Sequence, residues 1–316
     1  MKKTKLTLAL AGLMIASAAI VSSCKKKETT TTPAQDTNGS TASDNNQAEQ
    51  HSNDAESIGA QANESGSLST FRLSGGNASP FGAKDSVVKT TVGGVDIYTV
   101  VFTNFVGLDG HTRNGIISYT VSPSGAHYRD PGMVMTVATS AANVYTVDNN
   151  TVTINKTITN NGFVAAGSNL QWSITSNITI YKAGGGTITW GTTSPSPRTH
   201  VLLNTNAGST YDGTAVPTAY NGTGTAISWN EAIIEINGST SGTSADGVSF
   251  SASSSNIVRN MNCAPDPLRT HFHPFVAGTI TFQPAGKTAR IINFGTGMCD
   301  LTYTISIGSW SETLSL

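Results

Sequence analysis

Residues 93–102 read GGVDIYTVVF, and this stretch decides the fold class. β-Branched and aromatic side chains fill seven of the eight positions after the glycine pair, all except Asp96, in the short run that is typical of a β-strand. Gly93-Gly94 supplies the positive φ angles that a tight turn needs, and Val87-Val88 precede it. The stretch therefore predicts a hairpin of two antiparallel strands.

The same pattern recurs along the chain. Residues 144–147 and 151–154 flank Asp148-Asn149-Asn150, and residues 178–181 and 187–190 flank a glycine-rich turn, so each pair predicts a hairpin. Nothing in residues 71–316 shows ten residues of helical periodicity with a cap. We expect an all-β fold, an antiparallel meander that forms an elongated sheet or sandwich.

Composition supports this fold and excludes several protein classes. Only 12% of the residues are charged and 32 are glycine, which argues against a helical bundle, a coiled coil or an α/β nucleotide-binding enzyme. From Cys24 onward 15 basic residues face 19 acidic ones, a net charge of about −4, and beyond residues 25–27 the Lys and Arg of the expected folded part occur singly, with no basic patch. We therefore expect no nucleic-acid partner. No cofactor is expected either.

The N-terminus has the layout of a bacterial lipoprotein signal. A lysine-rich head, an apolar stretch over residues 6–21 and the sequence Val21-Ser22-Ser23-Cys24 predict a signal peptide over residues 1–23 and a lipidated Cys24. An ordinary signal peptide with an incidental cysteine is the alternative. Acyl chains on Cys24 would hold the protein on the outer membrane, facing the periplasm or the cell surface.

The segment after Cys24 is polar. Every aromatic residue lies at or beyond Phe71, and residues 25–70 hold only Ile58 and Leu68 as large aliphatics. A segment with so little apolar area is expected to stay disordered. We therefore predict a disordered linker over residues 24–70, with a typical reach of about 40 Å, followed by an all-β domain over residues 71–316.

Cys263 and Cys299 remain after Cys24 is assigned. Outside the cytoplasm two such thiols predict a disulfide. A metal site is the alternative, because His271 and His273 lie between them at a spacing that puts both on one face of a strand. Zinc sites usually pair their ligands more closely than this sequence does.

Two further hypotheses concern function. Paired carboxylates could cleave glycosides if they meet in space, and the candidates are Asp109, Asp130, Asp212, Glu231, Glu235 and Asp300. Glu235 and Glu231 fit the solvated face of a strand equally well. Aromatic rings on a sheet could instead stack on sugars, and the candidates are Trp172, Trp190, Trp229 and Trp310. Ordinary core packing is the alternative for these tryptophans.

The C-terminal part resembles a group of uncharacterised Bacteroidota lipoproteins. The resemblance rests on Cys263, on residues 274–282 (PFVAGTITF), on residues 291–300 (IINFGTGMCD) and on the closing residues 314–316. Asn293 and Thr296 replace acidic residues of that pattern and Leu301 replaces asparagine, so a cation-binding role for the turn is not implied. The resemblance implies a lipid-anchored, all-β, disulfide-closed protein without an assigned activity.

These observations favour a non-enzymatic, lipid-anchored envelope lipoprotein that acts as a structural or binding module. Its partners would be the membrane, through the lipid anchor, and a glycan or an envelope protein. A glycan-binding or adhesion protein is the first alternative, and a cryptic glycoside hydrolase is the second.

Overall fold

The computed structural model describes residues 37–65, 86–107, 110–140, 142, 144–163, 169–192, 196–203, 220–221, 225–226, 232–260, 263, 275–300 and 302–315. One helix and seventeen strands lie in these ranges. Their bounds are α2 Ser40–Ser65, β1 Ser86–Val92, β2 Val95–Val106, β3 Thr112–Ser122, β4 Val134–Ala138, β5 Thr146–Val147, β6 Asn150–Phe163, β7 Leu170–Tyr181, β8 Thr187–Thr192, β9 Arg198–Leu202, β10 Tyr220–Asn221, β11 Thr225–Ala226, β12 Ile233–Thr243, β13 Ser249–Asn260, β14 Phe275–Pro284, β15 Arg290–Thr296, β16 Thr302–Ile307 and β17 Trp310–Ser315.

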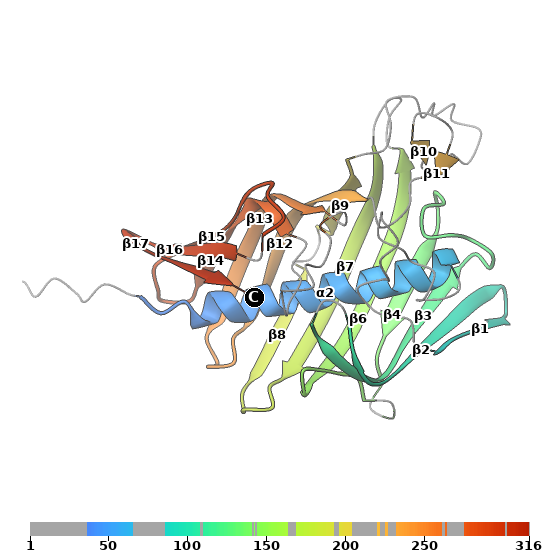
Figure 1. The fold of residues 1–316 in the computed structure, drawn as a ribbon, viewed down its shortest axis with the longest axis horizontal. Coiled ribbons are helices and arrows are strands. Elements are labelled where there is room, and N and C mark those ends of the chain that lie inside the picture. The colour runs from blue at the N-terminus through green and yellow to red at the C-terminus, as the bar shows by residue number, and fades with distance from the viewer. Residues whose placement is uncertain are drawn as a thin grey trace, which may run out of the picture. The chain divides into compact units, whose positions relative to one another are not determined.

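Fifteen strands form one antiparallel sheet that follows the chain almost in sequence order. The order is β1-β2-β3-β4-β6-β7-β8-β12-β13-β14-β15-β16-β17 (Figure 1). In addition, β5 pairs with β3 and β6, and β9 pairs with β7 and β12. β10 and β11 pair with each other. The predicted all-β antiparallel meander is confirmed, and so are its three hairpins, β1–β2, β5–β6 and β7–β8. The fifteen strands are one extended sheet and not two sheets packed as a sandwich.

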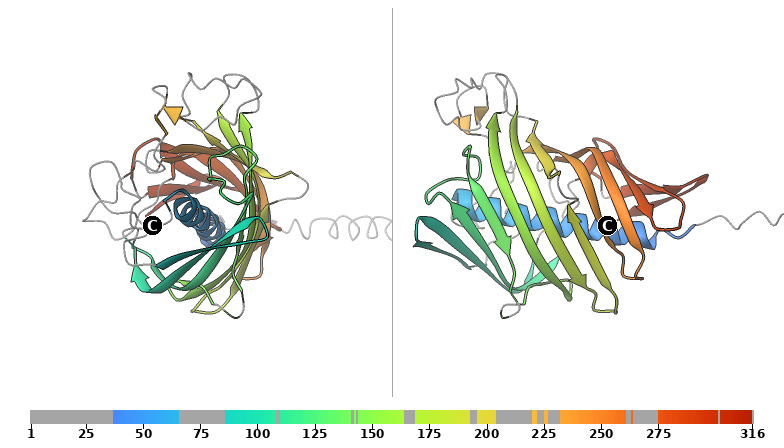
Figure 2. Two further views of the ribbon diagram at one scale, coloured as in Figure 1. Left: turned by 90° about the vertical axis from the view of Figure 1, so that its right-hand side faces the viewer. Right: turned by 180° about the vertical axis from the view of Figure 1, so that it is seen from behind.

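The helix α2 lies along the inner face of this sheet. Figure 2, left, looks along α2 and shows the strands curled around it. Near the end of α2, the Asn63 amide donates to the Tyr98 hydroxyl of β2 at 3.3 Å. Just before its start, the Asn38 carbonyl accepts from Arg290 of β15 at 3.3 Å. The sheet therefore winds along the helix, and its early strands surround the C-terminal end of α2.

The prediction of a disordered linker over residues 24–70 is wrong for residues 40–65, which form α2. The helix is buried over Asp44–Asn46 and from Ala48 to Asn63. Its few apolar side chains, among them Ala48, Ala55 and Ile58, join the core of the sheet. The estimate from apolar area failed because hydrogen bonds and ion pairs to the sheet satisfy many of the buried polar side chains of α2, among them its buried carboxylates.

Alternation along each strand places the core inside the curl. On β6, Val152, Ile154 and Ile158 are buried, while Thr153 and Asn155 between them are exposed. The outer face is thus rich in Thr and Asn, and the inner face is apolar except at a few positions. Those exceptions carry the site described below.

Gly59 marks the closest approach of helix and sheet. A Cβ atom at this position would lie 2.4 Å from two ring carbons of Tyr119 and 2.9 Å from the sulfur of Met135. The Tyr119 hydroxyl also donates to the Ala55 carbonyl one turn earlier, at 2.9 Å. The Tyr119 ring of β3 is therefore held against the glycine.

We expect Gly59→Ala to lower the free energy of unfolding by about 1 to 3 kcal/mol, because the added methyl group overpacks this contact. On an exposed helix the same change would raise stability by about 0.5 to 1 kcal/mol. Urea denaturation measures the effect. Gly184→Ala is the control, since a Cβ there meets no atom within 4 Å. A stabilising Gly59→Ala would contradict the packing of α2 inside the sheet.

Candidate functional site

The candidate site is the charged interface between α2 and the inner face of the sheet. Four carboxylates of α2 point at basic side chains that the sheet supplies. The pairs are Asp44 with Lys182, Glu49 with Arg198, Asp54 with Arg113 and Arg259, and Glu56 with Lys156 and His200. Among the described residues α2 contains no Lys or Arg, so the interface joins an acidic helix to a basic sheet face.

Strand geometry explains how the basic residues reach the helix. Lys156 follows Val152 and Ile154 at every second position of β6, so it points inward with them. Arg113 of β3 has the same parity as the buried Ile117 and Tyr119. Lys156, Arg113, Arg198, His200 and Arg259 thus stand in rows of core side chains and are fully or almost fully buried, whereas Lys182 lies just beyond β7 and its side chain is 34% exposed.

Glu56 is the centre of the most enclosed cluster. Its Oε1 accepts hydrogen bonds from the Tyr128 hydroxyl at 2.6 Å and from Nδ1 of His200 at 2.9 Å. Its Oε2 lies 2.6 Å from Nζ of Lys156, which also donates to the Ser52 carbonyl at 2.9 Å. Every polar atom of the carboxylate therefore has a partner although the side chain is buried.

Electrostatics fix the charges of this cluster. Burial alone would raise the pKa of Glu56, but the charges and hydrogen bonds of His200 and Lys156 outweigh it and hold the pKa well below its ordinary value. Burial lowers the pKa of His200, only partly offset by Glu56. At neutral pH Glu56 is thus a carboxylate and His200 a neutral imidazole whose Nδ1–H donates to Glu56, while burial lowers the pKa of Lys156 and Glu56 partly offsets this.

The cluster makes stability depend on pH. In the folded protein the pKa values of Glu56 and His200 both lie below those in the unfolded chain. On acidification the unfolded chain therefore binds more protons than the folded protein does, which favours unfolding. Stability is present above about pH 6.5 and is lost as the pH falls, by up to about 1.4 kcal/mol per pH unit for His200 alone. We expect the melting temperature to fall between pH 7 and pH 5.

Thermal melts of the variant His200→Gln at several pH values measure how much of the pH dependence of the melting temperature comes from this histidine. Its slope against pH should be shallower than that of the unchanged protein. His127→Gln is the control and should keep the original slope, because His127 is exposed and has none of these partners. Equal slopes for the His200→Gln variant and the unchanged protein would show that His200 is not buried beside Glu56.

Two arginines enclose Asp54 further along the interface. Arg113 and Arg259 contact its two carboxylate oxygens at 3.4 Å and 3.2 Å. Arg259 also donates to the Asn53 carbonyl at 3.0 Å and to the Ser57 hydroxyl at 2.6 Å. One guanidinium thus spans more than a turn of α2, which fixes the register between helix and sheet.

A histidine pair lies where His51 of α2 meets His111, the residue just before β3. His111 contacts Oδ2 of Asp148 through Nδ1 at 2.6 Å and the Gln50 amide nitrogen through Nε2 at 3.1 Å. The His51 ring lies edge-on to His111, with ring centres 6.3 Å apart. His51 is buried, and neither of its ring nitrogens has a hydrogen-bond partner in the structure. Burial and the neighbouring His111 lower its pKa to about 3.

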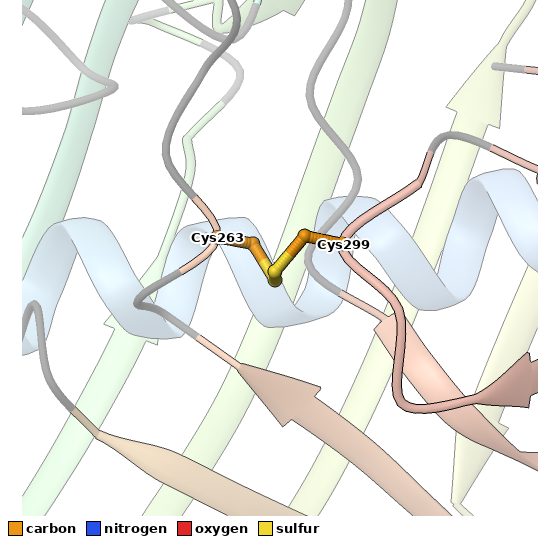
Figure 3. Close-up of a disulfide and its surroundings, with 2 residues drawn as sticks. All are labelled: Cys263 and Cys299. Atoms are coloured by element: carbon orange, nitrogen blue, oxygen red, sulfur yellow. A yellow bond between two sulfur atoms is a disulfide. The ribbon is translucent and has the colours of Figure 1, made fainter.

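The predicted disulfide is confirmed. Cys263, just beyond β13, is bonded to Cys299, between β15 and β16 (Figure 3). The bond removes both thiols as metal ligands, so the alternative of a zinc site with these two cysteines is wrong. His271, His273 and Cys24 lie outside the described residues.

The tryptophans proposed for sugar stacking are placed differently. Trp172 and Trp190 are buried on the inner face and cannot stack on a sugar from outside, so that prediction is wrong for both. Their environments are those of core side chains: Trp172 stacks on Tyr128, and Arg198 lies over the Trp190 ring. Trp310 is half-buried at the start of the last strand, β17. Trp229 lies outside the described residues.

The carboxylates proposed for glycoside cleavage are spread over separate elements where they are described. Asp130 accepts from the His127 amide in a turn, Glu235 accepts from Asn237 on β12, and Asp300 accepts from Thr302 before β16. Each has a local structural partner. Asp109, Asp212 and Glu231 lie outside the described residues.

No family model matches the chain, and no curated protein or solved structure matches it. In the described part of the chain, no helix is long and apolar enough to cross a membrane. The same residues hold no cluster of three or more His, Cys, Asp or Glu side chains suited to a metal ion.

Proposed function

We propose that the protein is a non-enzymatic lipoprotein of the cell envelope, anchored to the outer membrane through Cys24, that acts as a structural or binding module. The lipoprotein signal around Cys24 supports the anchor. The observation that supports a structural or binding module is the position of α2. This helix, which follows the proposed anchor in the sequence, lies along the inner face of the sheet and is buried there.

This arrangement couples the anchor directly to the core. Ser40, the first residue of α2, is 16 positions after Cys24. Sixteen residues span at most roughly 55 Å even when fully extended. The folded domain would therefore stay close to the membrane, and force on the anchor would act on a helix that is held by buried ion pairs.

Replacing the proposed acceptor tests the anchor. We expect Cys24→Ser to move the protein from the membrane fraction to the soluble fraction and to abolish incorporation of radiolabelled palmitate. Ser23→Ala is the matched control, because it keeps a small residue before the cysteine and should leave both readouts unchanged. Membrane association that persists in Cys24→Ser would overturn the proposed anchor.

A further inference from the structure

His51 is one of several buried polar side chains of α2 that the ion pairs of the interface do not satisfy, and it is the histidine among them. Both of its ring nitrogens are buried without a hydrogen-bond partner. A buried polar group without a partner costs about 1 to 3 kcal/mol, and such groups often mark a bound water or ion. The neighbouring side chains of His111, Gln50 and Asp148 favour an ion.

His111 is oriented as a metal-binding histidine. Its Nδ1 contacts Asp148 at 2.6 Å, and Asp148 in turn accepts from the Thr112 amide at 2.8 Å. A carboxylate that holds one imidazole nitrogen leaves the other, here Nε2, with its lone pair outward, which is the usual outer support of a metal ligand. Nε2 of His111 faces α2, where Gln50 and His51 lie.

We propose that His51, His111 and Gln50 form a binding site for a divalent first-row metal ion, Zn²⁺ or Cu²⁺. Imidazole nitrogens bind these ions at about 2.1 Å, so two ligating rings have centres roughly 5 to 6.5 Å apart. The observed 6.3 Å lies within this range. A 180° flip of the Gln50 side-chain amide exchanges its nitrogen and oxygen, so that the oxygen lies beside Nε2 of His111. This oxygen is the third ligand.

Charge and access are compatible with such an ion. Arg113, the cation that acts on His51, is paired with Asp54, so its charge is balanced. Asp148 adds a negative charge next to His111. Its side chain is 41% exposed and that of His111 is 11% exposed, so the site opens to solvent beside Asp148, between β5 and β6, while the buried His51 closes it from inside. A water molecule completes the coordination.

Calorimetric titration of the purified full-length protein with ZnCl₂ and with CuCl₂ tests the site. We expect one ion per chain, and loss of saturable binding in His51→Ala and in His111→Ala. Asp148→Asn keeps the size of the side chain and should weaken binding by about 10- to 100-fold. Circular dichroism of each variant shows whether it is folded, and Asp148→Asn carries the test if a histidine variant is not.

Two controls separate this site from other histidines. His127→Ala and the double variant His271→Ala/His273→Ala should bind as the unchanged protein does. Absence of saturable binding in the unchanged protein would overturn the proposal. So would binding that survives in folded His51→Ala, or binding that is lost in the double variant.

Discussion

Replacing Glu56 by alanine is expected to lower the free energy of unfolding by about 3 to 5 kcal/mol. The change removes the carboxylate that Lys156, His200 and Tyr128 surround. Lys156 would then hold a buried ammonium without its counter-charge, which is among the most costly defects in a protein core. Urea denaturation followed by circular dichroism measures the loss.

A second substitution should restore much of this stability. Combining Glu56→Ala with Lys156→Met removes the uncompensated charge and fills its space with an apolar side chain, so the double variant should be more stable than Glu56→Ala alone. Glu235→Ala is the matched control, since this carboxylate is only partly buried on β12. A loss of less than about 1 kcal/mol in Glu56→Ala would contradict the buried cluster.

Removing the disulfide should have the next largest effect. Cys263 and Cys299 are 36 positions apart, and closing a loop of this length stabilises a fold by about 3 to 4 kcal/mol in the chain-entropy treatment. We expect Cys263→Ser/Cys299→Ser to lose a comparable amount in urea denaturation. The bond ties the end of β13 to the segment between β15 and β16, so the loss should begin in the last strands.

Reductant provides the internal control for this prediction. Dithiothreitol should shift the denaturation curve of the unchanged protein toward that of the double serine variant and should leave the variant itself unaffected. A reductant effect of equal size on both proteins would show that the bond is not the cause.

Sequence patterns predicted the sheet well because its information is local. Turn residues such as Gly93-Gly94 and Asp148-Asn149 adopt the positive φ angles on which the hairpins depend. Period-two patterning then places each strand. The helix could not be found in this way, since α2 has neither an apolar stripe nor basic partners within its own segment. What buries it lies on strands far along the chain.

The candidate site had a signal that was available in the sequence. Lys156 continues the inward row of Val152 and Ile154, and Arg198 and His200 share a face with Leu202. A basic residue in an otherwise apolar row predicts a buried anion. The identity of that anion could not be predicted, because pairing Lys156 with Glu56 joins residues that are 100 positions apart. The cysteine pair, in contrast, was predicted from the oxidising compartment that the proposed signal sequence implies.

The position of α2 at the start of the chain sets the order of assembly. Its partners arrive much later: Arg259 lies 205 positions after Asp54, and Arg290 lies 252 positions after Asn38. Contacts of such long range slow folding, because loops must close before the contacts form. A chain that leaves the ribosome from its N-terminus would therefore expose this segment until the last strands are made. The polar surface of α2 suits that interval, since it can remain in water without aggregating, whereas an apolar core helix could not.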